Sequence, residues 1–143
     1  MTRSPISVSV HIDAPPEKVF AVLRDVERWP EWTSTMTSVQ RVQSGAFAVG
    51  STAHVRQPRL RPALWRVTEL EDQRNFTWTT RSLGLRMTAG HLIEPQGAGS
   101  RVTLSFELSG FMAPAVSRLY GGLIQRYMTT ESQGLKKRSE SAP

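Results

Sequence analysis

The chain has 143 residues, 38% of them hydrophobic, which suits one domain with its own core over residues 1–143. It has no cysteine, which excludes disulfides, thiolate metal sites and thiol redox chemistry, and favours a cytoplasmic protein. The net charge of +6 comes from 18 basic and 12 acidic residues, but these are dispersed, without the runs of like charge typical of nucleic-acid-binding tails. We therefore expect no nucleic-acid partner.

The N-terminal part of the chain predicts a strand followed by a short helix. Residues 5–13, PISVSVHID, alternate apolar and polar side chains, the pattern of a half-buried strand. Pro16 suits the first position of a helix with Glu17 in its first turn. The apolar stripe of this helix is Val19, Phe20 and Leu23, and it ends near Asp25. No signal-peptide pattern precedes the strand, and no apolar run approaches the about 18 residues of a membrane helix, so we expect no membrane insertion.

The next stretch, VERWPEWTSTM, places Trp29 and Trp32 on either side of a proline and a glutamate. Each buried tryptophan removes about 200 Å² of surface from water. We interpret the pair as a structural wedge that closes one end of the interior. The alternative, an aromatic clamp on a ligand, stays open for Trp32 in particular.

The middle of the chain predicts an antiparallel meander, because six apolar runs follow one another with turn residues and no helical segment between them. The predicted strands are residues 37–42, 51–56, 63–70, 75–81, 85–94 and 101–109, and the stretch PQGAGS is predicted as a turn. Gly110 is expected to end the last strand in a left-handed or extended conformation. A long amphipathic helix follows, and we expect it to end where a polar tail begins at about residue 137.

The order of these elements resembles a known family. The segments APPEKVFAVLRDVERWPEW, WRVTEL and GSRVTLSFELSG, followed by the terminal helix, are similar to the polyketide cyclase/dehydrase branch of the START-like (SRPBCC, birch-pollen-allergen-like) superfamily. The resemblance implies an α+β helix-grip fold, in which a curved, seven-stranded antiparallel sheet wraps the long helix, with two short helices after the first strand. It also implies a cavity between sheet and helix that binds a small apolar ligand.

Strand and helix periodicity predict which side chains face this interior. The helix should contribute Val116, Leu119, Tyr120, Leu123 and Tyr127, and the strands should contribute the other candidates. An ordinary packed core is the competing interpretation of the same pattern. The candidate ligand-binding residues are Trp65, Val67, Trp78, Met87, His91, Phe106, Tyr120, Leu123 and Tyr127.

His91 is the histidine that shares its spacing with an apolar strand face, and it is the candidate catalytic acid or base. A hydrogen-bonded structural histidine is the alternative. His11 is expected on the outer face, and the facing of His54 is open. Three scattered histidines without carboxylates at ligand spacing predict no metal site, and no sequence motif indicates a cofactor.

The connectivity of a meander places alternate loops at the same end of the sheet. The loops near Pro58 and Gly84 should therefore lie at the same end as the Gly110 linker. The family resemblance implies that this end is the entrance to the cavity. The alternative is that the arginines there are merely solvated. The candidate entrance residues are Arg56, Arg59, Arg61, Arg81 and Arg86, a basic collar suited to an apolar ligand with a carboxylate or phosphate.

Three classes of function remain open from the sequence. The first is polyketide cyclase, aromatase or dehydratase chemistry in a shaped pocket, which the resemblance implies without a universal catalytic motif. The second is a non-catalytic carrier or sensor of a lipid or metabolite. The third is a protein-interaction module that uses the sheet. Whether the chain acts as a monomer or a dimer is also open.

Overall fold

The computed structural model describes residues 6–141. Pro5, where the first predicted strand begins, and the last two residues of the predicted tail lie outside this range. The elements are β1 (Ile6–Ile12), α1 (Pro16–Arg24), the 3₁₀ helix η1 (Val26–Glu31), β2 (Ser38–Arg41), β3 (Thr52–Arg56), β4 (Ala63–Glu71), β5 (Asn75–Ser82), β6 (Leu85–Gln96), β7 (Gly99–Ser109) and α2 (Ala113–Glu140). This is the order that the sequence predicted.

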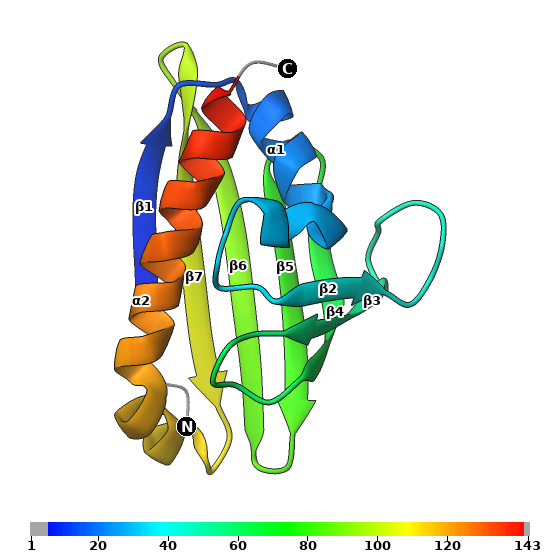
Figure 1. The fold of residues 1–143 in the computed structure, drawn as a ribbon, viewed down its shortest axis with the longest axis vertical. Helices are drawn as coiled ribbons and strands as arrows, with labels where there is room; N and C mark the ends of the chain where they lie inside the picture. Colours follow the sequence, from blue (N-terminus) through cyan, green and yellow to red (C-terminus); the bar gives the residue numbers. More distant parts are fainter. Residues whose placement is uncertain (1–5, 142–143) are drawn as a thin grey trace.

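The strands form one seven-stranded sheet in the order β1-β7-β6-β5-β4-β3-β2. Every neighbouring pair is antiparallel, with β2 to β7 as a meander and β1 added beside β7. The sheet curls so strongly that β2 and β3 cross the view almost at right angles to β6 and β7 (Figure 1). The helices α1 and α2 both lie on the concave side, which confirms the α+β helix-grip fold.

The short helices begin and end for local reasons. Pro16 opens α1 and Glu17 occupies its first turn, while the predicted stripe of Val19, Phe20 and Leu23 is buried. The following turn forms η1, whose Trp29 is 1% exposed and donates its indole N–H to the carbonyl of Leu23 at 2.9 Å. This buried hydrogen bond supports the structural interpretation of Trp29.

The helix α2 is longer than predicted, because it continues through the polar segment to Glu140. Lys136 donates to Glu140 at 2.6 Å, and Glu140 accepts a hydrogen bond from the backbone N–H of Asp13 at 2.8 Å. Arg138 donates to Glu31 at 2.8 Å. The polar side chains therefore fasten the last turns of the helix to β1 and η1 instead of ending it, which the polarity of the segment alone could not indicate.

The turn predicted over PQGAGS is also shorter than expected. The strand β6 runs to Gln96 and β7 starts at Gly99, so two residues make the hairpin turn. Gly97 adopts a φ of +61° there, the conformation that tight hairpins require and glycine adopts without strain. Among residues 6–141, no helix is both long and apolar enough to cross a membrane.

Candidate functional site

The inner face of the central strands carries the aromatic side chains that strand alternation predicted. Trp65, Val67 and Trp78 are 5%, 1% and 3% exposed. The ring centroid of Trp65 lies 5.7 Å from that of Trp78 and 6.4 Å from that of Phe106. Met87 and Phe106 pack against the same core and are half-buried. Both indoles thus lie on the predicted face, and the cavity that they would border stays a prediction.

His91 lies among aromatic rings at the centre of this face. It is 3% exposed, and its ring stacks on Phe76 with the centroids 4.5 Å apart and the planes 12° from parallel. The ring of Trp29 meets it edge-on at 5.5 Å. Its Nδ1–H donates to the backbone carbonyl of Phe76 at 2.8 Å. This bond fixes the orientation of the ring and leaves Nε2 directed toward α2.

The group opposite His91 Nε2 is Glu131 of α2, which sequence reasoning did not propose. Its Oε1 lies 3.7 Å from Nε2, and the two side chains are 12% and 4% exposed. The structure therefore brings together a buried imidazole and a buried carboxyl group between sheet and helix. The sequence signal that could have indicated this contact is the position of Glu131, a charged residue within the apolar stripe that contains Met128 and Leu135.

The two halves of α2 differ in burial. From Ile124 onward the helix buries Ile124, Met128 and Leu135. Tyr120 lies one turn before Ile124 on the same face but is 39% exposed, and Leu119 is 77% exposed. The expectation that Leu119 faces the sheet is therefore wrong, because the buried stripe of the helix passes beside it. The exposure of Tyr120 means that the sheet and loops do not cover this part of the helix.

The loop between β3 and β4 reaches across to the helix. Leu123 and Tyr127 are half-buried, and the Tyr127 hydroxyl donates to the backbone carbonyl of Pro58 in this loop. The next residue, Arg59, has a φ of +67°, a left-handed conformation that is uncommon for residues other than glycine. The contact closes the loop over the interior at the midpoint of α2.

The candidate entrance arginines form two groups, all exposed. Arg56 ends β3, while Arg59 and Arg61 belong to the β3–β4 loop. Arg81 and Arg86 face each other across the β5–β6 hairpin. This hairpin and the linker into α2 lie at the same end of the molecule, toward which the β3–β4 loop also extends (Figure 1). Meander connectivity predicted that the hairpin and the linker share this end, whereas the β3–β4 loop contacts the middle of α2 at Tyr127.

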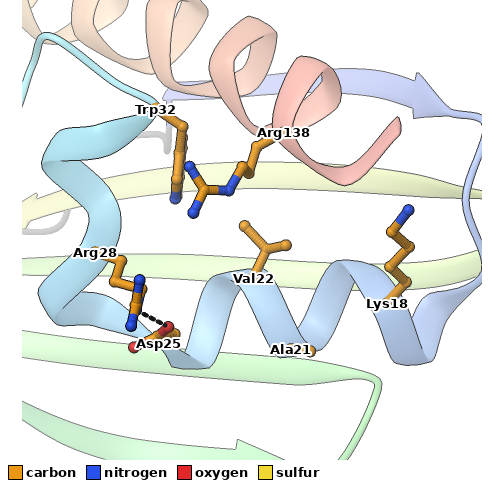
Figure 2. Close-up of a pocket in the computed structure, with 7 residues that line it drawn as sticks. All are labelled: Lys18, Ala21, Val22, Asp25, Arg28, Trp32 and Arg138. Carbon is orange, nitrogen blue, oxygen red and sulfur yellow. Dashed lines mark ion pairs between the residues drawn. The ribbon is translucent and has the colours of Figure 1, made fainter. Parts of the chain in front are cut away.

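A shallow pocket of about 190 Å³ lies outside the sheet-to-helix interior, between α1, η1 and the end of α2 (Figure 2). The indole Nε1 of Trp32 is buried without a hydrogen-bond partner. The cations there are largely paired: Arg28 lies 3.1 Å from Asp25, and Arg138 donates to Glu31 and thereby lowers the pKa of that carboxyl. The lining residues are Lys18, Ala21, Val22, Asp25, Arg28, Trp32 and Arg138.

A second hollow, of about 330 Å³, lies beside the β6–β7 hairpin and includes His11, Asp13 and Gln96. His11 is exposed, as predicted, and donates from Nδ1 to Gln96 at 2.6 Å and from Nε2 to Asp13 at 2.9 Å. These hydrogen bonds, the one to Gln96 first, raise the pKa of His11 above its ordinary value. His54 is also exposed, which settles its facing. Neither hollow includes a predicted ligand-binding residue.

The described part of the chain brings together no group of three or more histidine, aspartate or glutamate side chains that could hold a metal ion. Among the described residues, the buried ionisable side chains are His91 and Glu131.

A long helix held against the concave face of a seven-stranded antiparallel sheet defines the helix-grip class of proteins. The sequence profile described as "Polyketide cyclase / dehydrase and lipid transport" matches residues 5–140. The chain belongs to this family. No curated protein sequence matches it significantly.

Solved structures share the fold at low identity. The protein TTHA0849 from Thermus thermophilus is 18% identical, with 95% of this chain and 97% of that chain covered and a TM-score of 0.77. The Zhui aromatase/cyclase from Streptomyces sp. R1128 is 12% identical, with 98% and 94% covered and a TM-score of 0.79. Ara h 8.0201 is 14% identical, with 99% and 100% covered and a TM-score of 0.76. At these identities the likeness shows the fold alone.

Proposed function

We propose that the protein binds a small, largely apolar ligand between the sheet and the N-terminal half of α2. The observation that supports this site is the uneven burial of the interior. Met87, Ala89 and Phe106 on the inner face are partly accessible, and so is Tyr120 on the facing helix. Around His91 the interior is sealed. An apolar ligand would complete the core where it is incomplete.

The same end of the interior carries positive charge, which favours a ligand with a carboxylate or phosphate. Arg59 and Arg61 lie on the loop that Tyr127 holds against the helix through Pro58. Opening this loop would expose the interior beside cations that attract an anionic head group. Tyr127→Phe removes the hydrogen bond, and we expect it to speed both association and dissociation of the ligand.

Titration with naphthoate and with the neutral alcohol naphthylmethanol, followed by tryptophan fluorescence, tests this proposal. Phe106→Ala removes a half-buried ring from the inner face and should weaken the affinity for both probes by about tenfold. Burial of a large apolar side chain contributes about 1.5–3 kcal/mol, and tenfold corresponds to the lower end of this range. The control is Leu64→Ala, because Leu64 is 46% exposed on the outer face. Equal effects of the two variants, or no saturable binding by the wild type, would refute the proposed site.

A second candidate function is proton-transfer chemistry on the ligand, which the His91–Glu131 pair favours. In a dehydration, the pair would give its proton to a leaving hydroxyl group, which departs as water, and would regain a proton from the neighbouring carbon as the double bond forms. The Zhui protein is named an aromatase/cyclase, which is consistent with chemistry of this kind in the same fold.

His91 is 3% exposed, so this chemistry requires the ligand to displace the side chains that cover it. Turnover of a cyclisable polyketide-like substrate separates an enzyme from a carrier. His91→Phe should abolish turnover while probe binding persists. If the wild type binds the probes but turns over no such substrate, the protein is a carrier or sensor instead.

A further inference from the structure

A preformed apolar surface stands at the tip of the molecule, outside the proposed ligand site. Leu83 at the β5–β6 turn is 92% exposed, and in the linker into α2 Phe111 is 76% and Met112 40% exposed. We call these three residues the apolar tip. Scattered exposed leucines are common in soluble proteins, but neighbouring large side chains at a single tip indicate a binding surface.

Backbone contacts hold the apolar tip in place. The N–H of Met112 donates to the carbonyl of Gly84 at 2.8 Å. A Cβ at Gly84 would lie 2.5 Å from the Phe111 ring and 2.9 Å from the Met112 side chain, so the hairpin and the linker pack directly against each other. Gly84 and Gly110 have φ angles of +75° and +100°, which glycine adopts without strain. The β5–β6 hairpin and the linker into α2 therefore hold the apolar tip in a defined conformation.

The charge around the apolar tip is of one sign. Residues 79–89 and 108–118, which form the hairpin, the linker and the first turns of α2, contain no aspartate or glutamate. Arg81 and Arg86 face each other across the hairpin, two and three residues from Leu83, and Arg118 is exposed on the first turns of α2. Glu107 on β7 is the nearest carboxylate along these segments and is half-buried. The arginines of these two segments are Arg81, Arg86 and Arg118.

We propose that the apolar tip docks peripherally on a membrane surface rich in anionic lipids, with its large side chains in the interface and the arginines on the head groups. Apolar side chains flanked by arginine fit the layered chemistry of such a surface, which is anionic at the head groups and apolar beneath. A second copy of the chain fits poorly, because it would bring the same arginines together. This docking does not depend on the proposed ligand, although it would place the entrance beside the bilayer.

Sedimentation with vesicles tests the docking. Vesicles of phosphatidylcholine with about 30% phosphatidylglycerol should carry down the wild type, and phosphatidylcholine vesicles should not. Leu83→Ser with Phe111→Ser should weaken this binding by about tenfold. Arg81→Gln with Arg86→Gln should weaken it by about tenfold and reduce its dependence on salt. All these side chains are exposed, so melting temperatures should stay unchanged.

The matched controls are Val49→Ser with Leu64→Ser, which are 61% and 46% exposed elsewhere, and Arg24→Gln with Arg101→Gln, away from the apolar tip. Both should bind vesicles within about twofold of the wild type. Equal binding to neutral vesicles, no binding to either kind, or equal losses in tip and control variants would overturn the docking. A dimer abolished by the tip substitutions, or a DNA duplex that displaces the vesicles, would overturn it in favour of those partners. Probe binding without vesicle binding would overturn the docking alone.

Discussion

Replacing Glu131 by leucine removes the side-chain group that faces Nε2 of His91 across the interior. Its Oε1 lies 3.7 Å from that nitrogen. Leucine leaves Nε2 buried without a partner, at a cost of about 1–3 kcal/mol, partly offset by its apolar surface. We expect a net loss of about 2 kcal/mol from the free energy of unfolding. Glu131→Gln supplies an amide N–H to neutral His91, and its loss should stay below about 1 kcal/mol.

Urea unfolding of the wild type, Glu131→Leu, Glu131→Gln and His91→Phe measures these values from midpoints at unchanged slope. His91→Phe combined with Glu131→Leu should recover at least about 1 kcal/mol relative to the sum of the single losses, because no polar atom is then left unpaired. Additive losses would refute the reasoning that the two side chains form one polar unit, and so would a Glu131→Leu variant within about 0.5 kcal/mol of the wild type.

Three further outcomes are expected. Gly110→Val should lower the free energy of unfolding by more than about 2 kcal/mol, because at φ +100° its Cβ would lie 2.5 Å from the carbonyl oxygen of Gly84; an unchanged melting temperature would contradict this. Arg59→Gln with Arg61→Gln should slow naphthoate association at low salt while stability stays constant, and equal salt dependence for naphthoate and naphthylmethanol in the wild type would exclude the collar. Protonated His11 should stabilise the fold below about pH 6.5, and this contribution should disappear as pH rises through its raised pKa. The urea midpoint of the wild type should therefore fall over this pH range, and His11→Gln should lack the fall.

Strand alternation predicted much of the interior because a two-residue period fixes which face each side chain occupies. Trp65, Trp78 and His91 all lie where that period placed them. Glycine and proline positions likewise predicted the hairpin at Gly84 and the start of α1 at Pro16. These predictions needed only local backbone rules.

The missed features depend on contacts between distant segments. A glutamate within an amphipathic helix is ordinarily assigned to solvent, whereas Glu131 is buried where β6 places His91 opposite it. The polar end of α2 likewise stays helical because Glu140 and Arg138 meet groups of the N-terminal part of the chain. No spacing rule within the helix reports those partners.

The central claim, that a ligand binds on the inner face, is tested most directly by the indole N–H resonances of the four tryptophans during titration with naphthoate. Binding on the inner face should cause saturable shifts of the Trp65 and Trp78 resonances with one common affinity, while the Trp32 resonance, at the surface pocket of α1 and α2, stays nearly in place. A saturable shift confined to Trp32, or binding that moves no indole resonance, would contradict it.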